Sequence, residues 1–132
     1  MNVLIILGSV VGGVFVLLFG LRIWMAIKMQ KMQGKPVPDL PGRLGKAVRK
    51  GNPTIFYFYS PSCGACKAMT PVIQKMAKKG KSVFPVDISR DMDTARKFGV
   101  MATPTTILVS GGKVEQVRIG PQPEAELAHM VA

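Results

Sequence analysis

The chain opens with one long apolar segment and continues with short, patterned ones. Residues 2–21 carry no charged side chain. At about 1.5 Å per residue, a helix of this length spans roughly 30 Å, which matches the hydrocarbon core of a bilayer. The segment therefore predicts a transmembrane helix. Methionines at helical spacing beyond it indicate that the helix continues to about Gln33, so residues 1–33 are interpreted as an anchor with a basic juxtamembrane end.

A cleaved signal peptide is the alternative interpretation of this segment. It would require a basic start, a shorter apolar core and a small-residue cleavage site. Here the chain starts with an uncharged Met-Asn pair, and no A-x-A site closes the apolar run. The nearest basic side chains all follow the segment: Arg22, Lys28, Lys31 and Lys35. By the positive-inside rule, this asymmetry predicts a single-pass membrane protein whose remaining residues are cytoplasmic.

Gly8 and Gly12 have the G-x-x-x-G spacing that lets two membrane helices approach closely. The motif is short, and glycine is common in membrane helices. A homodimer through these glycines is therefore one interpretation, and ordinary helix composition is the other. An unchanged oligomeric state in a Gly12→Leu variant would exclude the dimer.

Residues 34–41 separate the anchor from the rest of the chain. They contain three prolines and predict a short, stiff linker. Asp39 is expected to cap a short helix over about 40–50, which Gly51 would end. The remaining residues, 42–132, are enough for one small domain.

The pattern of 42–132 alternates between helix and strand. The run at 54–59 is β-branched and aromatic throughout, which is typical of a central strand buried on both faces. Two strands joined by a crossover helix must be parallel, whereas a hairpin pair is antiparallel. The predicted strands are 54–59, 83–88, 105–109 and one through 117 and 119, and the predicted helices are 63–79, 91–98 and one opening at Pro123.

Composition narrows the function classes. The 18 Lys and Arg against 7 Asp and Glu give a net charge of +11, and Lys75, Lys78, Lys79 and Lys81 form a basic cluster that could attract the cytoplasmic leaflet. No nucleotide-binding motif is present, and without interleaved aromatic residues the basic charge does not indicate nucleic-acid binding. The single histidine, His129, is interpreted as a surface residue and leaves most metal-hydrolase and Ser-His-Asp chemistries without support.

The candidate chemistry lies in Cys63-Gly64-Ala65-Cys66, where the first strand meets the next helix. In an intracellular protein with a β-α-β pattern, a C-x-x-C motif indicates a redox-active pair of cysteines. Two intervening residues let the sulfur atoms bond within one helical turn. The exposed Cys63 would meet unpaired N–H groups at the helix N-terminus, which favour the thiolate. Cys66, one turn further on, is expected to be more buried and to resolve a mixed disulfide.

Two other interpretations of the cysteines stay open. They are two structural thiols, or they pair with the C-x-x-C of a second chain to hold a metal or an iron–sulfur cluster. Within one chain, two cysteines cannot fill a four-ligand zinc site. No metal or other cofactor is expected for the redox interpretation.

Here the chain resembles a known family. The segment from Ser60 to Lys67, followed by Pro71 in the same helix, is similar to the active site of thioredoxins and their helix-kinking proline. The segment from Lys97 to Thr105 resembles the part of thioredoxin that carries a cis-proline. The hairpin glycines and Gly120 match as well, so the resemblance covers about residues 40–132. It implies an α/β thioredoxin-like fold, a mixed sheet with flanking helices, in which the first edge strand is absent.

The resemblance also implies roles for residues. Thr103-Pro104 would be a cis peptide beside the cysteines that binds substrate main chain, with Pro104 keeping a backbone edge free. Gly64, Ala65 and Pro71 would support the active site. Cys63 and Cys66 would form the redox-active disulfide. The implied partners are a protein disulfide as substrate and a reductase or other dithiol as electron donor.

Three departures from the thioredoxin pattern stand out. Ser62 replaces the tryptophan before the first cysteine. Ala65 replaces a proline between the cysteines, and this change favours a somewhat more oxidising pair. Tyr57 stands where thioredoxins carry a buried aspartate, opposite Pro85 instead of a lysine. The proton acceptor for Cys66 is therefore open.

These observations predict a membrane-tethered thiol–disulfide oxidoreductase that reduces protein disulfides on the cytoplasmic side. The alternative within the same chemistry is an extracytoplasmic enzyme acting in cytochrome maturation or disulfide formation. The dimeric metal or iron–sulfur module is the alternative from another class.

Overall fold

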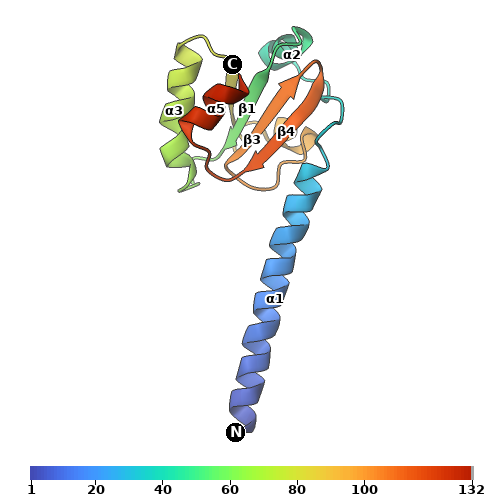
Figure 1. Ribbon diagram of the computed structural model, residues 1–132, viewed down its shortest axis with the longest axis vertical. Coiled ribbons are helices and arrows are strands. Elements are labelled where there is room, and N and C mark those ends of the chain that lie inside the picture. Colours follow the sequence, from blue (N-terminus) through green and yellow to red (C-terminus); the bar gives the residue numbers. More distant parts are fainter. Residues whose placement is uncertain (132) are drawn as a thin grey trace.

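The computed structural model describes residues 1–131. One long helix extends from a domain in which a sheet lies between helices (Figure 1). The predicted elements all form, with shifted ends. In chain order they are α1 (Asn2–Gln30), α2 (Gly42–Arg49), β1 (Thr54–Tyr59), α3 (Cys66–Lys78), β2 (Val83–Asp87), α4 (Met92–Lys97), β3 (Thr105–Ser110), β4 (Lys113–Ile119) and α5 (Glu124–Met130).

The sheet has the order β2-β1-β3-β4. β1 pairs with β2 in parallel, and β3 and β4 form an antiparallel hairpin, as expected. β3 runs antiparallel to β1, and so to β2, although the helix α4 joins β2 to β3. The expectation that a helical connection joins parallel strands is therefore wrong for this pair, whose strands lie on opposite sides of β1. Tyr57 lies opposite Pro85, as predicted. Among residues 1–131 no strand pairs with the outer edge of β2, in agreement with the expected loss of the first edge strand. Pro85 suits this edge because it has no N–H to offer a further strand.

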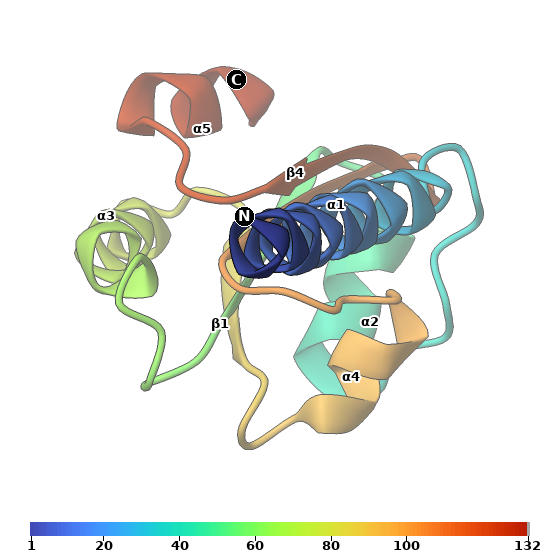
Figure 2. The ribbon, with the colours of Figure 1, turned by 90° about the horizontal axis from the view of Figure 1, so that it is seen from below.

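Both faces of the sheet are covered, which explains the unbroken apolar run of β1. Ile55 and Tyr57 face α3 and α5, where they pack with Ile73, Leu108 and others. Phe56 and Phe58 face the other side and pack on Phe98. Figure 2 shows α3 and α5 on one side of the sheet and α2 and α4 on the other.

The last turns of α1 belong to the domain. Met29 is only 2% exposed and lies in the same core cluster as Phe98 and Val114. Met32 packs on this cluster as well, so close to Gly99 that a β-carbon there would lie 3.6 Å from its Cγ. The methionine spacing that indicated a juxtamembrane helix therefore marks a stripe that packs against the sheet.

The predicted linker is bound to the hairpin along part of its length. The N–H of Gly34 donates to the carbonyl oxygen of Val114 at 2.6 Å, and the N–H of Val114 donates to that of Lys35 at 2.9 Å. The N–H of Val37 donates to the carbonyl oxygen of Gly112 at 2.9 Å. The proline-rich chain thus joins α1 to the domain through backbone hydrogen bonds.

The predicted cap of the next helix is wrong. α2 begins at Gly42 and follows Pro41, and no side chain caps it. The side chain of Asp39 is not involved, and its carbonyl oxygen accepts a hydrogen bond from Lys97 Nζ at 3.0 Å. The reason is that the N-cap position falls on Pro41, which is extended, so Asp39 lies two residues too early to cap the helix. The Leu40 side chain is buried, and its backbone approaches α2 so closely that a β-carbon at Gly45 would collide with the carbonyl oxygen of Leu40.

Thr106 provides a stability test in β3. Its hydroxyl is buried and has no hydrogen-bond partner among the described residues. A Thr106→Val change removes this unsatisfied group at nearly constant shape and is expected to raise the free energy of unfolding by about 1 kcal/mol. Thr105→Val is the matched control, because the buried Thr105 hydroxyl donates to the Ala102 carbonyl oxygen at 2.7 Å, and it should destabilise by about as much. Urea unfolding measures both, and a less stable Thr106→Val protein would contradict the argument.

Candidate active site

The two cysteines form a disulfide in the turn between β1 and α3. Cys63 and Cys66 are joined with their α-carbons 5.3 Å apart, so the predicted pair is confirmed. Cys63 is partly exposed, whereas Cys66 is 1% exposed. An external disulfide can therefore reach the sulfur of Cys63 but not that of Cys66, which is the asymmetry that attack and resolution require.

The helix after the disulfide starts later than predicted. α3 begins at Cys66 with Ala65 as its N-cap, because residues 61–65 form turns in which the N–H of Cys63 donates to the carbonyl oxygen of Ser60 at 3.1 Å. Cys63 thus precedes the helix and faces its first amide. The N–H of Cys66 donates to Cys63 Sγ at 3.2 Å. A hydrogen bond of this kind, at the positive end of the helix dipole, favours a thiolate at Cys63 once the disulfide is reduced.

The predicted substrate segment lies at the same end of the sheet. The Thr103–Pro104 peptide bond is cis, as the resemblance implied. Thr105 pairs with Phe58, so Pro104 lies beside the end of β1 that leads to the cysteines. Pro104 is buried and Thr103 is partly exposed. The backbone of Pro104 is held by a hydrogen bond, since the N–H of Gly120 donates to the carbonyl oxygen of Pro104 at 2.9 Å.

The three supporting residues lie along the cysteine turn and α3. Gly64 and Ala65 are exposed between the cysteines, and Pro71 lies inside α3 on an exposed position. Their placement matches the expectation, and their contribution to the chemistry stays a prediction.

Tyr57 lies beneath Cys66, where thioredoxins carry an aspartate. Its hydroxyl donates to the carbonyl oxygen of Cys66 at 3.3 Å and lies 3.3 Å from the hydroxyl of Thr70. Thr70 donates to the same carbonyl at 2.8 Å. Burial raises the pKa of Tyr57 above its ordinary value, against a smaller lowering by the Thr70 hydrogen bond. A neutral phenol with a raised pKa does not accept the proton of Cys66 at neutral pH.

A cavity next to Cys66 is also lined by a carboxylate. Its volume is about 560 Å³, and Cys66, Thr70 and Asp87 are among the residues that line it. Hydrogen bonds from the Ser89 hydroxyl and backbone N–H lower the pKa of Asp87, with burial opposing and Arg90 assisting. The carboxylate is therefore ionised at neutral pH and shares a solvent-accessible space with the buried cysteine.

Thr70 and Asp87 were not predicted as site residues. A usable signal exists for each of them. Thr70 follows Cys66 by four residues in a helix, where a hydroxyl can reach the carbonyl oxygen one turn back. Asp87 ends the strand parallel to β1, and parallel strands end at the same edge of a sheet.

Removal of the Tyr57 hydroxyl tests its role. Tyr57→Phe leaves Thr70 to hold the Cys66 carbonyl, so we expect the free energy of unfolding to fall by about 1 kcal/mol and disulfide reduction to stay within about twofold of wild type. Urea unfolding and turnover assays measure both effects, with Tyr59→Phe as control since no described hydrogen bond involves that hydroxyl. A drop in turnover of about tenfold or more would assign Tyr57 a part in proton transfer.

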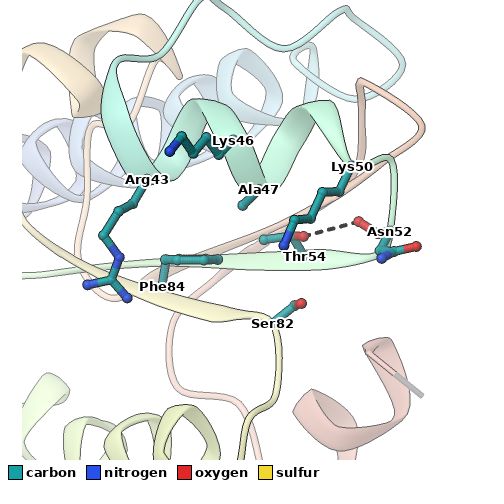
Figure 3. Close-up of a pocket in the computed structure, with 8 residues that line it drawn as sticks. All are labelled: Arg43, Lys46, Ala47, Lys50, Asn52, Thr54, Ser82 and Phe84. Atoms are coloured by element: carbon teal, nitrogen blue, oxygen red, sulfur yellow. Dashed lines mark hydrogen bonds between the residues drawn. The ribbon is translucent and has the colours of Figure 1, made fainter.

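A second pocket lies at the opposite end of β1. It has a volume of about 290 Å³ between α2 and the starts of β1 and β2, and Figure 3 shows three cationic side chains around it, Arg43, Lys46 and Lys50. It opens beside Thr54, whereas the cysteine turn follows Tyr59, so the full length of β1 separates it from the disulfide. Within residues 1–131, no three His, Cys, Asp or Glu side chains are grouped so as to hold a metal ion.

An exposed cysteine bonded to a buried one, with a helix amide on the outer sulfur and a cis-proline at the adjacent strand, defines a thiol–disulfide oxidoreductase. The family model for thioredoxin matches residues 42–132. The chain belongs to the thioredoxin family.

Relatives and solved structures agree with this assignment. The thioredoxin of Bacillus subtilis is 36% identical over 78 residues, which are 56% of this chain and 74% of that protein. The thioredoxin of Alicyclobacillus acidocaldarius is 30% identical over 90 residues, 66% of this chain and 86% of that protein. A variant thioredoxin of Halobacterium salinarum shares the fold with a TM-score of 0.61 at 23% identity, covering 74% of this chain and 88% of that one.

Proposed function

We propose that the protein is a membrane-tethered reductase of protein disulfides. The Cys63 thiolate attacks one sulfur of the target disulfide, forms a mixed disulfide and releases the other target sulfur as a thiolate. The Cys66 thiolate then attacks the Cys63 sulfur, releases the second target thiolate and closes the Cys63–Cys66 disulfide. Two electrons pass to the target, and a reductase or another dithiol restores them. The observation that carries this proposal is the difference in exposure between the two bonded cysteines.

The substrate chain is proposed to bind along Thr103 and Pro104. Backbone groups of Thr103, two residues before β3 begins, are suited to pair with an extended segment beside Cys63, as in other cases of strand addition. Gly64, Ala65 and Pro71 are proposed to shape the cysteine turn, with no bound cofactor required.

The tether is proposed from α1. Its 29 residues contain an 18-residue window of mean hydropathy 2.7 that is not buried in the protein, and Phe15 and Leu17 are each at least 70% exposed. An apolar surface of this extent is unfavourable in water, and the hydrocarbon core of a bilayer would bury it. The basic residues after the span favour a single pass with the domain in the cytoplasm. The open faces of Gly8 and Gly12, where a β-carbon would meet nothing within 4 Å, leave room for a homodimer.

A catalytic assay tests the redox half of the proposal. The purified full chain with a dithiol donor should accelerate the reduction of insulin disulfides over the donor alone. Equal rates with and without the protein would reject the reductase activity.

Thiol labelling tests the tether and its side. After mild reduction, a membrane-impermeant maleimide is applied to intact and to permeabilised cells. Labelling of Cys63 only after permeabilisation would agree with a cytoplasmic domain. Labelling in intact cells would reverse the orientation and favour extracytoplasmic thiol exchange.

A further inference from the structure

We infer that the docked end of α1 turns the redox site toward the bilayer, so that the substrates are disulfides in membrane proteins close to the membrane surface. The inference rests on the proposed reductase function and on α1 as the span.

The end of α1 and the domain form one unit. Met29 is buried in the core, and the backbone of Gly34 and Lys35 is hydrogen-bonded to Val114. Gln33 adds a side-chain hydrogen bond, since its Nε2 donates to the carbonyl oxygen of Glu115 at 2.9 Å. These contacts lie both within the last turn of α1 and just after it, so the domain does not rotate freely relative to α1.

The loop that precedes Pro104 lies next to the part of α1 that follows the apolar segment. Trp24 and Lys28 border a cavity of about 570 Å³ together with Val100 and Met101, two residues before Thr103. Trp24 follows the apolar segment by three residues, about 4.5 Å along a helix axis. Tryptophan and lysine at this position are typical of the headgroup layer, and Lys28 Nζ lies 4.8 Å from the centre of the Trp24 ring. The loop that precedes Pro104 is therefore at the depth of the interface.

The cysteine turn lies at the same end of the domain as α1. In Figure 1 the N-terminal end of α3, which carries Cys66, lies at the end of the domain from which α1 extends. Figure 2, seen from that side, shows the turn between β1 and α3 beside the sheet and drawn without fading, as a part that is not distant in this view. The C-terminal end of α3, with Lys75 and Lys78, lies at the opposite end. The lysine cluster expected to attract the leaflet therefore points away from the bilayer, and the redox site points toward it.

This arrangement limits the substrate by size. The headgroup layer on one side of a bilayer is only about 5–8 Å thick. A folded soluble protein would have to fit between the site and the membrane, whereas an extramembrane loop next to a transmembrane helix is already there. The site is thus suited to extended segments that leave the bilayer near it, which then pair with the backbone at Thr103.

The test uses the full chain in phospholipid vesicles with two membrane-bound substrates. Each is a single transmembrane helix that carries the same small disulfide loop. In the near substrate the loop follows the helix directly, and in the far one a polyproline spacer of about 15 residues holds it roughly 45 Å away. A small soluble disulfide reports basal activity. We expect the near substrate to be reduced about tenfold faster than the far one, since only the near loop shares the volume around the site.

An insertion variant removes the fixed orientation of the domain relative to the membrane span and keeps the contacts between the end of α1 and the domain. A Gly-Ser insert of about 20 residues between Arg22 and Ile23 lets the domain move by about 25 Å, while residues 23–37 stay docked. The near-to-far ratio should then fall to within about twofold, with unchanged reduction of the soluble disulfide. The same insert after Met1 is the control and should keep the wild-type ratio.

Two results would overturn the inference. One is equal reduction of near and far substrates by the wild-type protein, and the other is an unchanged ratio after insertion at Arg22. Failure of the proposed function is distinct, because the soluble disulfide would then not be reduced by any of the proteins.

Discussion

Cys63→Ser is expected to lower catalysed disulfide reduction at least about a thousandfold, because the covalent nucleophile is lost. Cys63 is the accessible sulfur of the pair, and the N–H of Cys66 supports its thiolate. Cys66 cannot take over the attack, since it is 1% exposed beneath the turn. Turnover of insulin disulfides by the purified full chain measures the effect.

Cys66→Ser is expected to stop the reaction one step later. Cys63 still attacks, but no thiol displaces the product, so the protein accumulates as a mixed disulfide with its substrate. Non-reducing electrophoresis and intact mass detect this adduct, which Cys63→Ser should not form. Ser62→Ala is the matched control, as it changes an exposed neighbour of Cys63 and should leave turnover within about twofold. Adducts in the Cys63→Ser protein would reverse the assigned roles.

The order of elements could be predicted from local pattern, because each element buries a recognisable face. The β1 run at 54–59 is apolar on both sides of its strand, and both sides are covered in the structure. The parallel pairing of β1 and β2 was predicted from the helix that connects them, and Tyr57 opposite Pro85 was predicted from the resemblance to thioredoxin. The start of α3 was not, since the turn hydrogen bond between Cys63 and Ser60 keeps the first residues out of the helix.

The docking of α1 could not be predicted, because its signal is ambiguous. Met29 and Met32 at helical spacing fit a membrane-surface helix as well as a packed one, and the partner surface, including Phe98 and Val114, lies far along the chain. The linker was equally ambiguous, since prolines allow both a free spacer and an extended segment that pairs with an edge.

The cysteines and the cis-proline are local motifs and could be predicted. The surroundings of Cys66 depend instead on long-range packing. The hydroxyls of Thr70 and Tyr57 both bond to the carbonyl oxygen of Cys66 because α3 packs against β1. Asp87 enters the same cavity only because β2 is parallel to β1.

A fragment that begins at Gly42, where the family match starts, is expected to be at least about 3 kcal/mol less stable than one that begins at Ile23. The shorter fragment loses the buried Met29 and Leu40 side chains and exposes the apolar surface of Phe98 and Val114 that they cover. It also loses the backbone hydrogen bonds of residues 34–37 to the hairpin. Urea unfolding of both fragments, followed by circular dichroism, gives the difference.

Single substitutions distinguish the effect of α1 packing on stability from the effect of shortening the chain. In the fragment that begins at Ile23, Met29→Ala removes most of one buried side chain and should destabilise by about 2–5 kcal/mol. Ile27→Ala, one half-turn away with 52% of the side chain exposed, should change stability by less than about 0.5 kcal/mol. Equal effects of the two substitutions, or equal stability of the two fragments, would mean that α1 is only a tether. The expected difference would instead make the end of α1 a structural part of the redox domain, which is the condition for a fixed orientation at the membrane.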